Sequence, residues 1–374
     1  MPNGIHVPKI VFTGGPCAGK TTGMSFCDEK LSDHGFKTFV CPELATLSIL
    51  GGFDPFSASE RELVSFEERL LSIQLAVEDH FVGLAQDYVT AHPEKKSVVL
   101  CDRGAMDVKA YLSGDQFGAI LDDLNLKVAQ IRDKRYEGVI HLVTAAIGAE
   151  EFYTCGNNKA RRETREEAIE MDRRTHDAWV GAPHLQSIDN ATDFEGKIKK
   201  AYRSICRVLG VPVPIEHERK YLVASFDRSK LPHHQVINIE QVYLMSEGDG
   251  EEIRVRKRGQ DGSFCYYKTK KVSTGVSGKR FETEWPIDGK EYCGELLYAD
   301  PRRAPVKKDR ICFSWKGQYF ELDVIERPAK HSGKTLLEIE LTEEAAAIEL
   351  PPFIQVVRDV TDDPSYSNSA LALI

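Results

Sequence analysis

The chain has 374 residues, of which 41% are hydrophobic and 29% are charged, and its formal net charge is −9. This balance is typical of a globular protein, and the length suggests two domains. The weakly polar run 44–53 is too short to cross a bilayer. The acidic net charge argues against general nucleic-acid binding.

The cysteines and the first residues indicate the cellular compartment of the protein. The nine cysteines lie at least ten residues apart, so the sequence has no CxxC pair and no zinc-ligand spacing. Reduced, buried thiols are therefore expected. Residues 1–7 lack both the basic start and the apolar core of a signal peptide. We expect a cytoplasmic protein without a transmembrane segment.

The first half alternates apolar runs with helical patterns. Short apolar runs bounded by turns are typical of buried parallel strands. From Leu63 to Tyr88 apolar residues recur every three or four positions, which predicts a long helix with a capping box at 57–60. Strands are predicted at 10–12, 39–41, 97–101 and 139–143, and further helices at 161–179 and 192–208. The alternation predicts an α/β domain over 1–209, with a parallel sheet and flanking helices.

A phosphate-binding loop follows the first predicted strand. Residues 14–21 read GGPCAGKT and match GxxxxGK[ST] between a strand and a helix. The glycines let backbone N–H groups point at phosphate oxygens, and the helix N-terminus adds a favourable dipole. Lys20 is expected to reach the β- and γ-phosphates and the Thr21 hydroxyl to bind Mg²⁺. The predicted nucleotide site comprises Gly14, Gly15, Pro16, Cys17, Ala18, Gly19, Lys20, Thr21 and Thr22.

Charged residues elsewhere in the first half fit such a site. Asp102 follows the third strand, where the second Mg²⁺-associated carboxylate belongs. Glu43 follows the second strand and is either a base or a helix cap. Arg161 and Arg165 form either a cationic lid over the phosphates or a solvated helix face. Asn190 is expected to cap the last helix beside a box at 192–195. No guanine-reading motif is present, so ATP and GTP both remain open.

The pattern changes after the Pro-rich joint at 209–214. The dominant period becomes two, in segments separated by Gly and Pro turns. Strands are predicted at 216–223, 251–258, 264–270, 280–285, 310–315, 319–325 and 336–341. Antiparallel strands in this number predict a β-barrel with accessory helices over 215–374.

Most of these strands carry charges two residues apart, hence on one face. Like charges on neighbouring strands repel unless opposite charges lie between them. A closed barrel with a polar interior resolves this, because basic residues bind polyphosphate and acidic residues bind divalent cations. The predicted basic lining is Lys220, Arg254, Arg256, Lys268, Lys270, Arg280, Lys308 and Arg310. The predicted metal ligands are Glu216, Glu218, Asp323, Glu338 and Glu340.

These residues resemble a known family. Glu216-x-Glu218-x-Lys220 is similar to the ExExK signature of the CYTH superfamily, the triphosphate tunnel metalloenzymes. The later charged strands and the closing stretch 360–368 extend the resemblance over nearly all of 215–374. The first half resembles AAA-related P-loop domains of the nicotinamide-riboside-kinase-like type. Joined in this order, the halves resemble the eukaryotic TRPL translocation defect protein group. That resemblance implies guanine nucleotide and phosphoinositide binding, and with it peripheral membrane association.

Three functions follow from this reading. The first is a tunnel triphosphatase that uses Mg²⁺ or Mn²⁺ to hydrolyse tripolyphosphate or a nucleoside triphosphate, joined to a domain that binds ATP or GTP. The many carboxylates favour it, because a pure anion-binding surface would not need them. The second is a regulatory adaptor that binds GTP and phosphoinositides with little turnover. The third is a small-molecule, nucleoside-like kinase in the first half.

Overall fold

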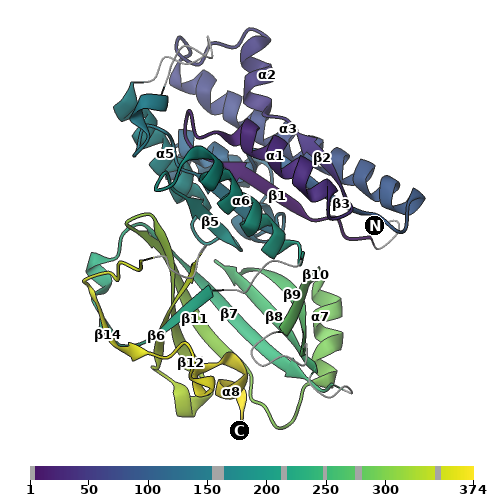
Figure 1. The fold of residues 1–374 in the computed structure, drawn as a ribbon, viewed down its shortest axis with the longest axis vertical. Coiled ribbons are helices and arrows are strands. Elements are labelled where there is room, and N and C mark those ends of the chain that lie inside the picture. The colour runs from purple at the N-terminus through teal and green to yellow at the C-terminus, as the bar shows by residue number, and fades with distance from the viewer. Residues whose placement is uncertain (1–4, 154–163, 212–216, 247–250, 274–279, 342–346) are drawn as a thin grey trace. The chain divides into compact units, whose positions relative to one another are not determined.

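The computed structural model describes residues 5–153, 164–211, 217–246, 251–273, 280–341 and 347–374. Two compact units divide the chain, 1–211 and 212–374. The division falls in the Pro-rich joint. Each unit is built round a sheet of its own, parallel in the first and antiparallel in the second (Figure 1).

The parallel sheet of the first unit has the strand order β2-β3-β1-β4-β5. Its strands are β1 (Lys9–Thr13), β2 (Phe36–Cys41), β3 (Lys96–Asp102), β4 (Gly138–Leu142) and β5 (Leu185–Ile188). Every residue of β1 and β4 is buried, which explains their continuous apolar runs. The predicted parallel sheet is confirmed. The sequence missed β5 because its four residues are half polar.

Helices flank this sheet, as predicted. They are α1 (Lys20–Ser32), α2 (Leu44–Leu50), α3 (Glu60–Ala91), α4 (Gly114–Asp123), α5 (Arg165–Trp179) and α6 (Phe194–Val208), with a 3-10 helix η1 (Ala105–Tyr111) and a π-helix η2 (Ala129–Asp133). The capping box of α3 is formed by Ser59 and Glu62, two residues after the predicted box. Asp193, rather than Asn190 or Thr192, caps α6. No described helix is long and apolar enough to span a membrane.

The second unit is a single nine-stranded antiparallel sheet, ordered β10-β9-β8-β7-β11-β12-β13-β6-β14. Its strands are β6 (His217–Phe226), β7 (His234–Leu244), β8 (Glu251–Gln260), β9 (Ser263–Ser273), β10 (Arg280–Ile287), β11 (Val306–Trp315), β12 (Gln318–Arg327), β13 (Thr335–Leu341) and β14 (Ile354–Asp359). The antiparallel arrangement is confirmed. The predicted barrel closure is not seen among the described strands, because β10 and β14 stand at opposite edges. The sequence missed β7 and β14, whose polar and apolar residues do not alternate cleanly.

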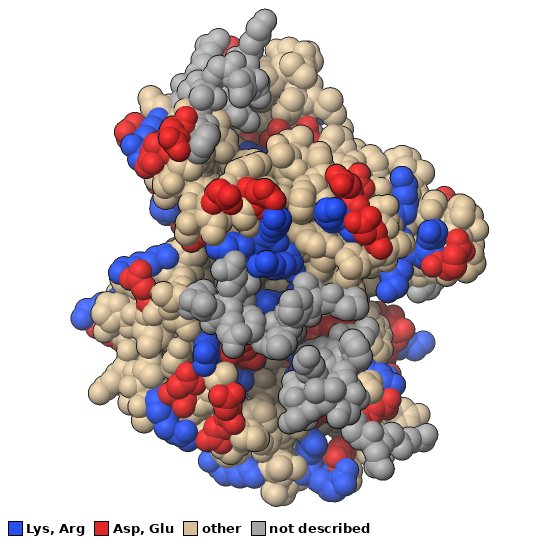
Figure 2. Space-filling view, in the orientation of Figure 1, with Lys and Arg blue, Asp and Glu red and all other residues tan. Residues whose placement is uncertain are grey.

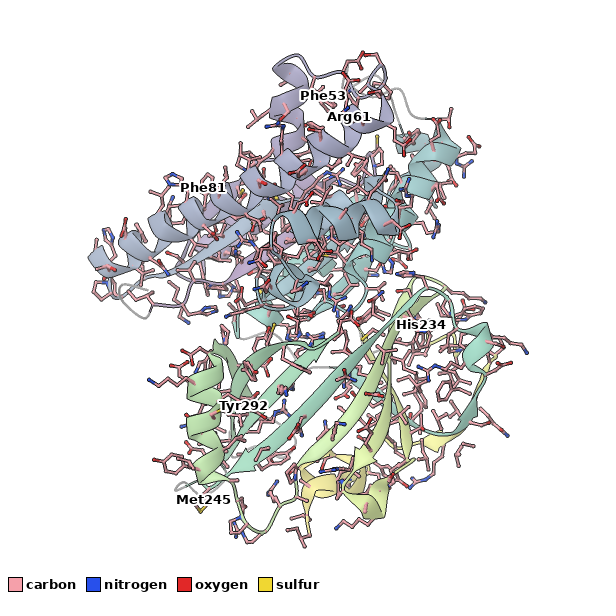
Figure 3. The ribbon with its side chains drawn as sticks, turned by 180° about the vertical axis from the view of Figure 1, so that it is seen from behind. Phe53, Arg61, Phe81, His234, Met245 and Tyr292 are labelled. Carbon is pink, nitrogen blue, oxygen red and sulfur yellow. The ribbon has the colours of Figure 1, made fainter. Side chains whose placement is uncertain are left out.

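One face of this sheet is apolar and packed. Phe313, Phe320 and Leu337 are fully buried in a cluster on it. The helix α7 (Gly289–Glu295) covers another part, where Tyr292 packs against Val255 (Figure 3). Because side chains alternate along a strand, the residues between these face the other way.

The opposite face, called here the charged face, carries many charged residues. Cross-strand partners share a face, and the register places the following described residues on it: Glu218, Lys220, Arg254, Arg256, Arg258, Lys271, Glu284, Lys308, Arg310, Glu321, Asp323 and Glu338. At one end the helix α8 (Asn368–Ala372) packs Leu371 against Leu336. Elsewhere on the second unit, basic and acidic side chains are interspersed on the surface (Figure 2).

Candidate functional sites

The phosphate-binding loop of the first unit runs from the end of β1 to the start of α1. Gly14 has φ 139°, and a Cβ there would lie 2.1 Å from the carbonyl oxygen of Leu142. Only glycine fits this close approach. Gly19, at φ 89°, turns the chain into α1. Thr21 and Thr22 are exposed in the first helical turn, as a metal-binding hydroxyl requires. The strand–loop–helix context is therefore the predicted one.

Lys20 and Asp102 meet at the carboxyl edge of the sheet. The Lys20 ammonium lies 3.5 Å from the Gly14 carbonyl oxygen, and burial, with Arg103 nearby, lowers its pKa. Asp102 ends β3 in register with Phe12 of β1. Burial raises the pKa of the Asp102 carboxyl, although Lys20 opposes the shift. Its Oδ1 is buried without a hydrogen-bond partner in the described structure, which fits an oxygen awaiting a cation or a donor.

Arg103 organises the neighbouring acids. It has φ 70°, a conformation that non-glycine residues rarely adopt. Its guanidinium donates to Glu43 at 2.6 Å and to Asp107 at 3.3 Å. Burial tends to raise the pKa of Glu43, but Arg103 and Lys20 outweigh it and lower that pKa to about 2. Glu43 is thus a held anion at the start of α2, and its low pKa makes it a weak base.

The predicted lid is only partly within the described structure. Arg161 lies outside the described residues. Arg165 begins α5, and its guanidinium donates to the carbonyl of Ala146 at 3.0 Å and to Glu150 at 2.6 Å. In the described structure Arg165 therefore holds the segment after β4. Asn190 also contacts this segment, through the carbonyls of Thr144 (2.9 Å) and Ile147 (2.7 Å).

In the second unit, a chain of ion pairs crosses β11, β12, β13 and β6 of the charged face. Asp323 is fully buried between Lys308 and Arg310, whose Nε lies 2.7 Å from its Oδ1. Arg310 also reaches Glu338 at 2.8 Å. Glu338 in turn binds Lys220 at 2.8 Å, and Lys220 lies 3.4 Å from Glu218. The chain alternates in sign at every step, which removes the repulsion that the sequence pattern implied.

This network shifts proton affinities in opposite directions. Burial lowers the pKa of Lys220, but Glu338 and Glu218 outweigh it and raise that pKa above its ordinary value. Burial also lowers the pKa of Lys308, and Asp323 does not fully offset this effect. Burial alone raises the pKa of Glu338, yet Lys220, Lys308 and Arg310 hold it below its ordinary range. Glu338 is therefore an anion paired with cations of the protein, and Asp323 forms ion pairs with Lys308 and Arg310.

Three arginines of β8 form the other part of the charged face. Arg254 and Arg258 are buried, and Arg256 lies 3.6 Å from Glu284 of β10. Thr269 of β9, opposite Arg254, donates its hydroxyl to Glu284 at 2.7 Å. Arginine side chains are well suited to phosphate oxygens because the guanidinium binds them through two N–H groups.

The register separates two predicted residues from this group. Lys268 lies opposite Val255, and Lys270 lies opposite Ile253, so both are on the apolar face. Lys268 pairs with Glu295 of α7, and Lys270 pairs with Glu251. The structure therefore does not bring them to the arginines. Lys271, opposite Glu252, lies on the charged face. The sequence analysis missed it because the run 268–271 contains lysines at both odd and even positions, which alternate between the two faces.

The predicted metal ligands are only partly described. Glu216 lies outside the described residues, and for Arg280 and Glu340 only the backbone is described. Glu340 is the direct cross-strand partner of Glu218, whose side chain is half exposed. Like charges at directly opposed positions of a sheet repel, and a divalent cation between them removes that repulsion. Within the described ranges, no group of three or more His, Cys, Asp or Glu side chains is placed to hold a metal.

Comparison with known proteins assigns a family to each unit. A sequence model of the AAA domain family matches residues 9–197, just over half of the chain. The inorganic triphosphatase of Nitrosomonas europaea is 37% identical over 163 residues, which are 42% of this chain and 97% of that protein. The chain belongs to the AAA domain family in its first unit and to the family of this triphosphatase in its second.

Solved structures show similar coverage. A crystal structure of an inorganic triphosphatase is 32% identical, covers 43% of this chain and 97% of its own, and has a TM-score of 0.33. The NadR protein in complex with NR is 14% identical, covers 56% of this chain and 53% of its own, and has a TM-score of 0.39.

Proposed function

We propose that the second unit of this AAA-domain protein hydrolyses the terminal phosphoanhydride of a triphosphate with a divalent cation, and that the first unit binds a Mg²⁺–nucleotide. The observation that carries the first part is the charged face. Its cations and carboxylates lie side by side on one sheet, in a unit of the inorganic triphosphatase family. We also propose that this unit closes round the substrate as the predicted tunnel.

The two ends of the charged face have different tasks. Between β11 and β6 the cations are matched by Asp323, Glu338 and Glu218. On β8 three arginines share the charged face, and Arg256 lies 3.6 Å from Glu284 of β10. These arginines would bind the phosphate oxygens of the substrate, because a guanidinium can donate two N–H groups to one phosphate. The end at β6 and β13 would hold the cation, through Glu218 with Glu216 and Glu340.

When bound at that end by these carboxylates, a divalent cation would neutralise phosphate oxygens and lower the pKa of a bound water. The residues of the chain do the rest. Arg254, Arg256 and Arg258 hold the phosphates in one orientation and stabilise the charge that develops on the leaving oxygen. Lys220, kept protonated by Glu338, remains a cation near the carboxylates at neutral pH. Asp323 and Glu338 fix Arg310 rather than bind metal.

The test is phosphate release from tripolyphosphate, ATP and GTP with Mg²⁺ or Mn²⁺. We expect Glu216→Gln together with Glu218→Gln to abolish release. Glu326→Gln, which changes an acid of β12 paired with Lys307, serves as the matched control and should leave release unchanged. Normal turnover in the folded double variant would refute the metal assignment.

In the first unit, Lys20, Thr21 and Asp102 would hold the Mg²⁺–nucleotide. The buried, unbonded Oδ1 of Asp102 supports this, since it fits an oxygen ligand or an acceptor of a water proton. We expect Lys20→Ala to weaken nucleotide binding while leaving tripolyphosphate hydrolysis largely intact, because the two sites lie in separate units. Loss of hydrolysis in this variant would instead indicate one composite site.

The kinase and adaptor hypotheses remain predictions. The low pKa of Glu43 disfavours it as the base of a kinase, and Asp102, whose pKa is raised, is the better candidate. Phosphoinositide binding rests on the resemblance alone. Direct competition between ATP and GTP would show which nucleotide the first unit prefers.

A further inference from the structure

Three consecutive carbonyl oxygens of the phosphate-binding loop are held from outside the motif. The Pro16 carbonyl accepts a hydrogen bond from the Thr144 hydroxyl at 2.5 Å. The Cys17 carbonyl accepts one from the backbone N–H of Ala145 at 3.3 Å. The Ala18 carbonyl accepts one from the Lys197 ammonium at 3.1 Å. These partners follow β4 or lie on α6, far from the loop in sequence.

Because a trans peptide is planar, these hydrogen bonds also fix the direction of the N–H groups that follow each carbonyl. In such a peptide, the carbonyl of one residue and the N–H of the next point in opposite directions. The N–H groups of Cys17, Ala18 and Gly19 must therefore point away from Thr144, Ala145 and Lys197. Positive φ at Cys17 (58°) and Gly19 (89°) is the geometry that brings successive N–H groups to one side. The result is an anion-binding cradle.

Lys197 is an unusual residue for this task. Its side chain is 2% exposed, and its ammonium donates to three oxygens: those of Ala18, the Val143 carbonyl (2.6 Å) and the Asn190 amide (2.8 Å). None of these acceptors is a carboxylate. Burial outweighs the attraction of Asp172 and lowers the pKa of Lys197 to about 8. Burying an ammonium without a carboxylate partner costs free energy, so we expect this lysine to have a function.

Thr144 is the second anchor. It is fully buried, and its own N–H donates to Asp172 at 3.0 Å. The same Asp172 oxygen accepts the Gly15 N–H at 2.8 Å. A Cβ on Gly15 would lie 2.8 Å from that oxygen, so this glycine is required by α5 and not by a phosphate. The start of the loop is thus fixed to α5 while the following carbonyls are fixed to Thr144 and Lys197.

On the basis of the nucleotide binding proposed for the first unit, we propose that Lys197 and Thr144 are positioning residues for phosphate binding. They hold the carbonyls of Ala18 and Pro16 behind the loop, and so direct the N–H groups of Gly19 and Cys17 toward the phosphates. Neither residue touches the ligand. These two residues lie behind the phosphates and not at the base. Their replacement should therefore weaken the binding of every ligand that carries a diphosphate to the same extent.

The experiment measures binding of a fluorescent ADP analogue with Mg²⁺ to the full chain, and its displacement by inorganic pyrophosphate. The component of binding that Lys20→Ala removes defines the loop site. Lys197→Met should weaken that component roughly tenfold or more for ADP and for pyrophosphate alike. Lys199→Met is the matched control on the same helix. Lys199 is exposed and pairs with Glu195 at 2.5 Å, so its loss should leave binding unchanged.

Thr144 provides a second test that does not depend on the folding of the lysine variant. Thr144→Ser keeps the hydroxyl donor and should bind like the wild type. Thr144→Val keeps the shape without the donor and should lose affinity as Lys197→Met does. A loss common to Ser and Val would indicate packing alone and overturn the role of the hydroxyl.

The outcomes separate the two proposals. If Lys20→Ala binds the ADP analogue as the wild type does, the loop is not the binding site. The positioning role is then overturned as well. A Lys20-dependent site that Lys197→Met and Thr144→Val leave intact would overturn the positioning role only. Loss of ADP affinity with unchanged pyrophosphate affinity would place Lys197 at the base rather than behind the phosphates, and would also overturn it.

Discussion

The face on which each basic residue lies predicts different effects for two similar substitutions on neighbouring strands. Arg256 of β8 is on the charged face, whereas Lys268 of β9 is on the apolar face beside α7. Replacing Arg256 by Gln removes a cation from the proposed phosphate path. Replacing Lys268 by Gln removes one partner of a peripheral ion pair. We expect only the first change to reduce hydrolysis.

The magnitudes follow from the surroundings of each side chain. A hydrogen bond to a charged group contributes about 1.5–3 kcal/mol, which is about 10- to 150-fold in kcat/KM if it is made in the transition state. The Lys268–Glu295 pair is about a quarter exposed on each side. Such a pair contributes at most about 1 kcal/mol to stability and nothing to the reaction. Its loss should change kcat/KM less than about twofold.

The assay is steady-state hydrolysis of tripolyphosphate, with urea denaturation of each variant to confirm folding. Lys271→Gln extends the test. Because Lys271 lies on the same face of the sheet as Arg256, this change should also reduce hydrolysis. Equal losses for Lys268→Gln and Arg256→Gln would refute the reasoning, since the register gives these two residues opposite faces.

Further predictions concern stability and ligand competition. Asp323→Asn should destabilise the second unit by about 3–5 kcal/mol in chemical denaturation, because it removes the buried anion that Lys308 and Arg310 share, whereas Glu326→Gln at the surface should cost less than about 1 kcal/mol. Burial raises the pKa of Glu67 to about 8, so the folded form keeps a proton that the unfolded form releases, and stability should fall as pH rises from about 4.5 to 8. Glu67→Gln should remove that fall, a gain of about 3 kcal/mol at pH 8 relative to pH 5, and equal pH profiles for variant and wild type would contradict it. Any phosphoinositide affinity in vesicle sedimentation should be displaced by tripolyphosphate with Mg²⁺, and binding that persists at saturation would place the lipid site elsewhere.

Much of the local structure was readable from the sequence. The glycine pattern of 14–21 identified the phosphate-binding loop, because its backbone conformation depends on residue types within the motif itself. The apolar runs before residues 13, 42 and 102 indicated buried parallel strands, since such strands have two covered faces. The period of two after residue 215 likewise indicated antiparallel strands. The capping box of α3 was placed two residues early, because Ser57 and Ser59 both offer a serine followed by a glutamate three positions on.

The sequence alone therefore indicates the content of each strand and loop, whereas the residues that meet in space depend on the tertiary fold. Period two shows that Lys268 and Lys270 share a face, but the pairing of β9 with β8 decides that this face is not that of Arg256. The anchors of the phosphate-binding loop come from Thr144 and Lys197, which no motif connects to it. Side-chain alternation is a property of one strand, whereas register and long-range hydrogen bonds depend on how separate segments pack.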